Sequence, residues 1–401
     1  MARPDPIELG LRQLARDRER KVAIPELVRR KVEKVMVSPL AFLRGSAPLF
    51  YEMLAEHPEL LGGPPDAGHL CGDAHVENFG VFRTAHTKKG SVTDPELAAF
   101  VFDVNDFDET VVGPWRLDVL RLLASLVLAG REFTAGGPQI IALVRALLDA
   151  YVGAAFLGKG PPDAPPPVAR LLSKAEKRGA QELLDRRTEI VGGARRFIIG
   201  ERYLALPEEL ARQARQAFTD YTRSLGEAAP GSHYDLVDLA FRVAGTGSLG
   251  TLRVAVLARG KGAVDGGWLF DMKEEGGPAA ASLCGAGEPD GATRVLTGMQ
   301  ACLDSPPRML GKTKLGSTSM LVRRLAPQED KLDLTRIAKG ELEGVARLLG
   351  ALLGRAHRRG ATSASAAPWS KGDLDALIDQ AVTIAGVHEA AYLAYCKAAL
   401  P

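Results

Sequence analysis

The sequence predicts an α+β protein, and three observations support this prediction. Helical patterns dominate both ends of the chain. From Leu236 onward the pattern becomes strand, glycine turn, strand, turn and strand, in the segments LVDLAFRVA, GTGSLG, TLRVAVLARG and GWLFDMKEE. A segment at 98–104 that is rich in Phe and Val predicts a buried strand in the first half of the chain. Elements grouped in this way predict helical and sheet regions that pack together.

The predicted elements follow in a definite order. Helices are expected over 8–36, 48–56, 117–130, 139–157 and 291–303, and strands over 69–84, 98–104, 236–244, 251–260, 267–275 and 319–326. The segment GKGPPDAPPPVAR, at 158–170, is the clearest linker, because its prolines are not expected to join a helix or an inner strand. The last third is predicted to be helical, with LEGVARLLGALLGRAHRRG as its most amphipathic part.

Composition narrows the classes of protein. With 401 residues the chain is long enough for two lobes or domains. Its 51 Lys and Arg residues against 49 Asp and Glu residues argue against a dedicated nucleic-acid binder. The four cysteines form no Cys-x-x-Cys pair, which favours a reducing compartment over a zinc site or a disulfide framework. The N-terminus lacks the apolar core of a signal peptide, and the most apolar stretch, 117–129, is too short to span a bilayer. We therefore expect a cytoplasmic protein with no membrane partner.

The first chemical motif is GDAHVENFG, at 72–80. It places a carboxylate, Asp73, and a carboxamide, Asn78, on one loop between two predicted strands. Phosphoryl transfer needs a carboxylate near the acceptor hydroxyl and an oxygen ligand for Mg²⁺, and such a loop supplies both. His75 either orients this loop or is a satisfied loop histidine. The alternative for the whole motif is a structural turn capped by Asp and Asn.

The second motif is FDVNDFDET, at 102–110, which carries Asp103, Asp106, Asp108 and Glu109 at the end of an apolar strand. Because like charges repel, a fold that gathers these carboxylates normally needs a cation. Hard oxygen ligands favour Mg²⁺, Mn²⁺ or Ca²⁺ over zinc. The alternative is a solvated acidic turn, which the apolar stretches on both sides disfavour.

The third motif is GTGSLG, at 245–250, between two predicted strands. A dinucleotide-binding loop would open a helix and would be followed about 20 residues later by an acidic residue for the ribose, and neither feature is present. A glycine loop between antiparallel strands instead covers nucleotide phosphates in kinases. Lys273 lies in the next predicted strand, where it can reach those phosphates. Its alternative is a surface lysine at a strand end.

Together the motifs resemble those of the kinase-like superfamily, and most closely its aminoglycoside and choline phosphotransferase branch. In that branch a loop of the form His-Gly-Asp-x-His-x-x-Asn is followed by a hairpin, by Ile-Asp-Phe/Trp-Asp, by a Gly-Asp-Pro-like turn and by a helix that begins Asp-Leu-Ala. This chain has GDAHVEN, NDFDE, Gly113-Pro114 and Leu117-Asp118-Val119 in that order. The resemblance implies a protein-kinase-like two-lobe fold. The glycine loop and the lysine precede the catalytic loop in kinases and follow it here, so the resemblance implies a circularly permuted form of that fold.

The resemblance also implies a role for each motif. Asp73 would act as the catalytic base, with His75 beside it, and Asp118 would anchor the catalytic loop. The implied ligands of Mg²⁺ are Asn78, Asp106 and Asp108. The implied ATP-binding residues are Gly245, Thr246, Gly247, Ser248, Gly250 and Lys273. For one site to form, the two groups of motifs must face each other across a single cleft.

The chain is also similar to the bacterial family known as domain of unknown function 2252. The matching segments are SPLAFLRG, GDAHVENFG, FDVNDFDETVVGP, RVAGTGSLG, FDMKE, LVRRLAPQEDKLDL and GRAHRRG, which cover most of 36–360. The family name implies no activity, so the functional inference rests on the motifs. Within these segments we expect Arg44 to contact phosphate or substrate, and Arg323 and His357 to be structural.

The predicted organisation has four parts. They are 1–157, with N-terminal helices and the catalytic-loop part of the larger lobe; 158–189, a linker and a helix; 190–330, a β-rich nucleotide-binding lobe; and 331–401, helices that pack on the larger lobe.

The predicted function is the ATP- and Mg²⁺-dependent transfer of phosphate to a hydroxyl of a small molecule or protein, which the sequence does not identify. The sequence also does not separate ATP from GTP, or indicate the oligomeric state. Three alternatives stay open. They are AMP transfer from a flipped nucleotide, a catalytically idle nucleotide-binding module, and a metal-dependent hydrolase in which the glycine loop is only a tight hairpin.

Overall fold

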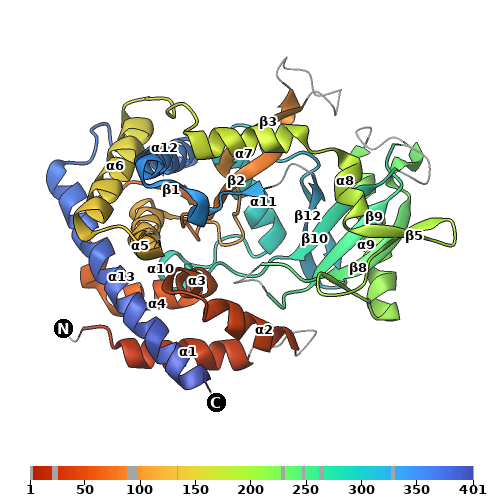
Figure 1. Cartoon of the computed structure of the whole chain (residues 1–401), viewed down its shortest axis with the longest axis horizontal. Helices are drawn as coiled ribbons and strands as arrows, with labels where there is room; N and C mark the ends of the chain where they lie inside the picture. The colour runs from red at the N-terminus through yellow and green to blue at the C-terminus, as the bar shows by residue number, and fades with distance from the viewer. Residues whose placement is uncertain are drawn as a thin grey trace.

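The computed structural model confirms the α+β prediction, since helices occur together with antiparallel sheets. It describes residues 3–19, 26–87, 98–132, 134–226, 231–245, 249–261, 266–326 and 330–400. Most of the helices lie on one side of the molecule and the largest sheet lies on the other (Figure 1). The helical side and the sheet side meet at a junction in the middle of the molecule.

The N-terminal segment forms four helices, which are α1 (Pro6–Glu19), α2 (Glu26–Val35), α3 (Pro39–Gly45) and α4 (Ala47–Glu56). The predicted break before Ser38-Pro39 is confirmed, because Ser38 caps α3 by accepting a hydrogen bond from the backbone N–H of Ala41. Helix α1 packs against the last helix of the chain, α13 (Lys371–Ala399), so the two chain ends lie close together (Figure 1).

Two small sheets carry the first two motifs. One contains β1 (Ala67–Leu70), β4 (Val111–Pro114) and β14 (Ala361–Ser363), and the other contains β2 (Phe79–Thr87), β3 (Ala98–Val104) and β13 (Asp330–Lys331). Strands β2 and β3 pair antiparallel, which confirms the predicted hairpin between the two motifs. The loop at 71–78 connects β1 to β2, and the loop at 105–110 connects β3 to β4, so both loops emerge from neighbouring strand ends.

The main hydrophobic core joins these strands to the long helices α5 (Arg116–Glu132), α6 (Gly137–Phe156), α12 (Leu342–Arg359) and α13. The C-terminal helices therefore pack on the same core as the motif loops, as the sequence predicts. Helix α6 is long and apolar enough to cross a membrane, but 61% of its most apolar window is buried inside the protein. It packs closely on α12, because a Cβ atom at Gly350 would lie 2.1 Å from the carbonyl oxygen of Leu147.

The six-stranded antiparallel sheet has the order β11-β12-β10-β9-β8-β7. Its strands are β7 (Tyr203–Leu204), β8 (Leu236–Arg242), β9 (Arg253–Ala258), β10 (Trp268–Glu274), β11 (Gly311–Leu315) and β12 (Thr318–Leu325). Helix α9 (Glu208–Ser224) covers one face through a separate apolar cluster, and Leu184 and Phe197 pack on the other. These two residues belong to α8 (Ala180–Asp185) and to the hairpin of β5 (Thr188–Val191) and β6 (Ala194–Phe197).

The remaining elements connect the two sides. They are α7 (Pro166–Lys177), α10 (Ala281–Cys284), α11 (Gly291–Cys302) and the short 3₁₀ helices Pro58–Leu60, Gly231–Tyr234, Leu334–Arg336 and Lys339–Glu341. The predicted helix over 291–303 is confirmed as α11, which packs on β12 of the sheet and on α12.

The linker prediction is wrong at its C-terminal end. Pro166 and Pro167 belong to the first turn of α7, where a helix does not need their missing N–H groups. The segment before them, 158–165, has no helix or strand. Helix α7 packs on β2 and β3, so this part of the chain also contributes to the folded structure.

Candidate active site

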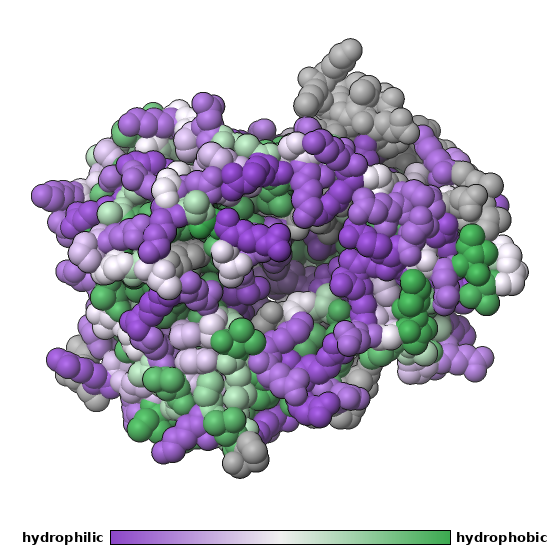
Figure 2. Space-filling model, in the orientation of Figure 1, coloured by the Kyte–Doolittle hydropathy of each residue, from purple (hydrophilic) through white to green (hydrophobic). Residues whose placement is uncertain are grey.

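A cavity of about 770 Å³ lies where the motif loops meet the sheet. Its lining includes Asp73, Asp106, Asp108, Gly245 and Lys273, which come from all three motifs and from strand β10. In Figure 2 this face of the molecule is hollowed between the helical side and the sheet side, and hydrophilic residues surround the hollow. The two groups of motifs therefore share one cavity, although the sequence places them far apart.

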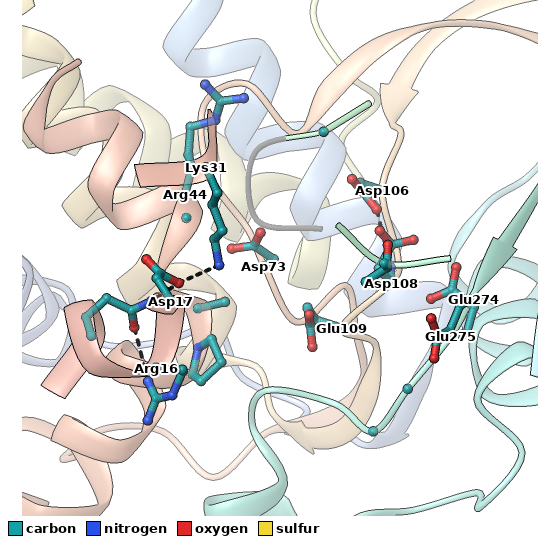
Figure 3. Close-up of a pocket in the computed structure, with 18 of the residues that line it drawn as sticks. Arg16, Asp17, Lys31, Arg44, Asp73, Asp106, Asp108, Glu109, Glu274 and Glu275 are labelled. Carbon is teal, nitrogen blue, oxygen red and sulfur yellow. Dashed lines mark hydrogen bonds and ion pairs between the residues drawn. The ribbon is translucent and has the colours of Figure 1, made fainter. Parts of the chain in front are cut away.

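The arrangement of carboxylates around the cavity is uneven. Figure 3 shows Asp73 between two groups, with Asp17, Lys31 and Arg44 on one side and the acidic loop and Glu275 on the other. On the first side, the Lys31 amine forms an ion pair of 2.7 Å with buried Asp17. The side near the sheet is thus the more acidic one.

The loop of Asp73 is held in place by its neighbours. Gly72 has a φ of +81°, and a Cβ atom at this position would lie 1.8 Å from the carbonyl oxygen of Glu109. A glycine is therefore required, because the first motif loop passes directly against the second. The Asp118 carboxylate accepts hydrogen bonds from the backbone N–H groups of Cys71, at 2.8 Å, and Gly72, at 3.0 Å. The predicted anchoring role of Asp118 is confirmed.

Asp118 has a second partner in the core. The His357 Nε2 atom lies 3.2 Å from its Oδ2 atom, and the His357 Nδ1 atom lies 2.9 Å from the hydroxyl of Tyr151. All three side chains are buried. The structural role predicted for His357 is confirmed, since it contacts the aspartate that anchors the first motif loop.

The carboxylate of Asp73 has one close cationic partner. Arg121 on α5 donates a hydrogen bond of 2.6 Å from Nε to Asp73 Oδ1. The His75 Nε2 atom lies 3.8 Å from Asp73 Oδ2. Burial raises the pKa of Asp73 to about 6, although Arg121 opposes this shift. Burial also lowers the pKa of His75, so His75 is neutral beside Asp73 at neutral pH.

Asn78 and Asp106 lie on adjoining loops. The Asn78 Nδ2 atom donates to the backbone carbonyls of Asp73, at 3.0 Å, and Asp106, at 3.1 Å. This pair of bonds fixes the amide and ties the two loops together. The Asn78 Oδ1 atom is buried and accepts no hydrogen bond from the described residues. It is therefore the kind of oxygen atom that a metal ligand requires.

The four carboxylates of the second motif do not all converge. Asp103 lies on β3 and pairs with Arg355 at 3.1 Å. Asp106, Asp108 and Glu109 line the cavity. The expectation that one arrangement gathers all four is thus wrong for Asp103, because it precedes the loop and belongs to the strand.

The sequence places Glu109 among the four carboxylates of the second motif but assigns it no role of its own. Its Oε2 atom accepts a hydrogen bond of 2.6 Å from the backbone N–H of Ala279. Burial, together with the nearby charge of Asp73, raises its pKa to about 7. A carboxyl group with this pKa exchanges its proton near neutral pH, so Glu109 is a second candidate for proton transfer.

The glycine turn is placed as the sequence predicts. It connects the antiparallel strands β8 and β9, and Lys273 lies on the adjacent strand β10, paired with Arg253. Gly245 lines the cavity, whereas Gly250 is buried in a left-handed conformation with a φ of +95°. The predicted contacts of Thr246, Gly247 and Ser248 lie outside the described residues.

Lys273 has two acidic partners. Its amine forms an ion pair with Asp108 of the second motif, and Glu275 Oε1 lies 3.6 Å away. Helix α11 carries no glutamate, but its Arg294 donates to the backbone carbonyls of Asp108 and Gly276, both at 2.8 Å. The carboxylate partners of Lys273 are thus Asp108 and Glu275. Burial raises the pKa of Glu275 to about 7.

Two arginines of the matching segments also reach the site. Arg44 lines the cavity and forms an ion pair with Glu77 of the first motif. Arg323 lines a smaller adjoining cavity of about 370 Å³, and its Nε atom lies 3.9 Å from buried Asp271. The placement of Arg44 suits its predicted contact with phosphate or substrate, and Arg323 lies at the site as well.

The residues present fit Mg²⁺ only as an ion shared with phosphate. Among the described residues, no group of three or more His, Cys, Asp or Glu side chains is arranged to hold a metal. Mg²⁺ bound with phosphates needs only one or two carboxylates and keeps several waters. Asp106 lines the cavity and meets that requirement. Asn78 has a free Oδ1 atom on the adjoining loop, but its side chain is buried and does not line the cavity. Asp108 meets it less well, because Lys273 already pairs with it.

Comparison with known proteins gives one match. No curated protein and no solved structure matches the chain. The family model described as an uncharacterized protein conserved in bacteria, domain of unknown function 2252, matches residues 20–398. Because this match spans nearly the whole chain, the protein belongs to that family.

Proposed function

We propose that this protein is an ATP- and Mg²⁺-dependent phosphotransferase that acts on a hydroxyl group. In this proposal the kinase-like parts occur in circularly permuted order. The observation that carries it is the ion pair between Lys273 and Asp108 inside the cavity that Asp73 also lines. A phosphate-binding lysine, a metal-binding loop and a catalytic base must meet in this way for phosphoryl transfer.

The side chains divide the work as follows. The Asp73 carboxylate accepts the proton of the acceptor hydroxyl, and a pKa of about 6 leaves it mostly ionised at neutral pH. Lys273 exchanges part of its contact with Asp108 for the donor phosphates. Asn78 and Asp106 would hold Mg²⁺, which when bound would neutralise charge on the phosphates. The acceptor enters on the side of Arg44, away from the sheet.

The compartment follows from the same proposal. An ATP-dependent enzyme needs a compartment that contains ATP. The four cysteines of the protein are all free thiols. Free thiols stay reduced in the cytoplasm. We therefore propose a cytoplasmic enzyme.

Nucleotide binding is the first test. Addition of ATP and Mg²⁺ should raise the thermal unfolding midpoint, because a ligand that binds only the folded state stabilises it. The Lys273→Ala variant should lose most of this increase. The matched control is Lys314→Ala, which removes an exposed lysine from β11 of the same sheet. No increase with any purine nucleotide would exclude the proposal.

The fate of the phosphates is the second test. ATP labelled at the γ-phosphate or at the α-phosphate is incubated with the protein, Mg²⁺ and mixed acceptors. Label transferred from the γ-position supports phosphotransfer. Transfer from the α-position would instead indicate AMP transfer, and release of inorganic phosphate alone would indicate a hydrolase. Asp106→Asn should abolish metal-dependent turnover and leave the protein folded.

A further inference from the structure

Helix α2 contacts both sides of the cavity. On the sheet side, the Lys34 amine donates a hydrogen bond of 3.0 Å to the backbone carbonyl of Gly245, the first residue of the glycine turn. The Arg30 guanidinium donates a hydrogen bond of 3.3 Å to the backbone carbonyl of Glu201, just before β7. Arg30 and Lys34 are four residues apart, so both lie on the same face of the helix. In Figure 1, α2 extends from the other N-terminal helices toward the sheet side.

On the helical side, α2 is held by a buried ion pair. The Lys31 amine lies 2.7 Å from Asp17 Oδ1, and both side chains are buried (Figure 3). The same carboxylate accepts hydrogen bonds from Gln13 Nε2, at 2.9 Å, and from the Tyr395 hydroxyl, at 3.0 Å. Asp17 and Gln13 belong to α1 and Tyr395 belongs to α13, so this cluster joins α2 to two helices of the helical side. Helix α2 also packs on α3.

The two attachments differ in strength. Breaking a buried ion pair leaves a buried charge without its partner, which is strongly unfavourable. A single hydrogen bond from an exposed side chain to a carbonyl exchanges readily with water and contributes much less. Lys34 is exposed and Arg30 is half-buried. Helix α2 is therefore fixed to the helical side, whereas its contact with the sheet side can break and re-form.

The two cations contact the sheet side although carboxylates are available on their own helix. Arg29, which is exposed on α2, pairs with Glu26 at 3.4 Å and with Glu33 at 3.8 Å. Among the described residues, neither Arg30 nor Lys34 forms an ion pair with a carboxylate, and both instead donate to backbone carbonyls of the sheet side. A hydrogen bond from a charged donor is stronger than one from a neutral donor. These two residues are therefore placed to hold the sheet side.

Gly245 is the point at which this contact bears on the site. It lines the cavity and has a φ of +88°, a conformation that glycine adopts without strain. Because the backbone of a glycine is restrained least by its own atoms, the direction of its carbonyl depends on outside partners. The Lys34 amine is such a partner. The start of the glycine turn is thus held relative to the helical side through α2.

We infer that α2 is a strap that positions the glycine turn over the cavity, and that Lys34 is the positioning residue. With the hydrogen bond formed, the start of the turn stays at the cavity, and with it broken the turn moves away more readily. Lys34 is not among the described residues that line the cavity, so it should affect nucleotide binding and not the chemical step at Asp73. The role of the turn in binding phosphate rests on the proposed function, whereas the link between α2 and the turn does not.

Hydrogen exchange of the full-length protein tests this link without any ligand. Lys34→Met removes the donor and keeps a side chain of similar length and helix propensity. Peptides that cover the glycine turn should exchange about threefold faster, or more, in this variant, because loss of a contact raises local opening. The matched control is Arg29→Met, which removes an exposed cation whose ion pairs lie within α2 and should exchange as the wild type does. Unchanged exchange in Lys34→Met, or equal acceleration in both variants, would overturn the inference.

Steady-state kinetics test the consequence for the site. Lys34→Met should raise the KM for ATP by about 3- to 10-fold, the effect expected for one exposed hydrogen bond from a charged donor, and should leave kcat within about twofold of the wild type. Lys34→Arg keeps a charged donor and should restore most of the affinity. Arg30→Gln should have a smaller effect, because Glu201 is not among the described residues that line the cavity. A fall in kcat with an unchanged KM would overturn the positioning role of Lys34.

The two proposals fail in different ways. Faster exchange at the turn in Lys34→Met, without any transfer of label from ATP by the wild type, would support the link between α2 and the turn and exclude the phosphotransferase. Transfer of label with the same KM for ATP in the wild type and in Lys34→Met would do the reverse.

Discussion

Two aspartates on opposite sides of the site have arginine partners but opposite electrostatic character. Asp73 on the helical side pairs with Arg121, and burial nevertheless raises its pKa to about 6. Asp271 on the sheet side has Arg242 and Arg253 against it, and their charges hold its pKa far below the usual range despite burial. The two pKa values shift in opposite directions because the number of neighbouring cations differs, although both residues are aspartates.

The site thus contains one aspartate suited to proton transfer and one that holds arginines in place. A partly buried carboxylate with a single cation beside it keeps a pKa near the working pH, which suits proton transfer. A carboxylate surrounded by arginines stays ionised and instead holds those arginines in place. Asp73 is therefore suited to accept a proton, and Asp271 is suited to fix the positions of its arginine partners. Each of the following predictions tests one side of that contrast.

The largest expected effect is on turnover, at Asp73. Asp73→Asn preserves the shape of the side chain but removes the base, so kcat should fall about 10²- to 10⁴-fold. Binding of ATP should remain, because Asp73 faces the acceptor. The measurement is label transfer together with calorimetry on the same preparation. An unchanged kcat in this variant would show that Asp73 is not the catalytic base.

The next largest effect is on stability, at Asp271. Asp271→Asn leaves buried guanidinium groups without their counter-ion, and breaking a buried ion pair costs about 3–5 kcal/mol. The free energy of unfolding in urea measures this loss. Asp73→Asn serves as the comparison and should cost less, since one arginine is affected. If the two variants lose equal stability, the contrast between the two aspartates is wrong.

Much of the site was accessible from the sequence. The motifs at 72–80 and 102–110 predict a loop flanked by strands and a second loop after a strand, and both are present. The strands on either side of the motif at 245–250 pair antiparallel, as the sequence predicts. The anchoring role of Asp118 was also predicted, and His357 was expected to be structural, although its contact with Asp118 was not predicted. The loops and strands follow from local sequence patterns. The role of Asp118 follows from its place after the two motifs along the chain.

The remaining features depend on tertiary register, which the sequence does not specify. Arg121 lies within an apolar helix, and nothing in its neighbours indicates that it points at Asp73. The arginine cluster around Asp271 requires that β9, β10 and β12 lie side by side in a particular register. One local signal was available, because Asp271 interrupts an apolar strand two residues before Lys273. At Pro166 a local signal was misleading, since a proline can begin a helix as well as prevent one.

The pH dependence gives a smaller but sharper test. If Asp73 is the base, kcat/KM should rise with pH and reach half its plateau near pH 6, because the ionised form is active. Stability should change in the opposite sense. Protonation of Asp73 stabilises the folded state fully below pH 3.8, and this stabilisation is lost as the pH rises through about 6. The Asp271 contribution is present above 3.8 and is lost as the pH falls below it.

The measurement is urea unfolding of the wild type and Asp73→Asn at several pH values. The stability of the variant relative to the wild type should increase between pH 4 and pH 7, since the variant has no carboxyl group to ionise. A difference that is constant over this range would contradict the raised pKa of Asp73. The acid limb of the kcat/KM profile supplies an independent value from the same samples.

The smallest expected effect concerns Arg44, which faces the cavity and is partly exposed. Its charge lowers the pKa of Asp73, although burial and Arg121 have larger effects. Arg44→Gln should therefore move the midpoint of the kcat/KM profile upward by less than about one pH unit. Arg44→Lys keeps the charge and should leave the midpoint unchanged. Because the interaction is partly exposed, the shift should shrink at high salt. A downward shift, or an equal shift in the lysine variant, would mean that Arg44 acts through contact with the substrate and not through its charge on Asp73.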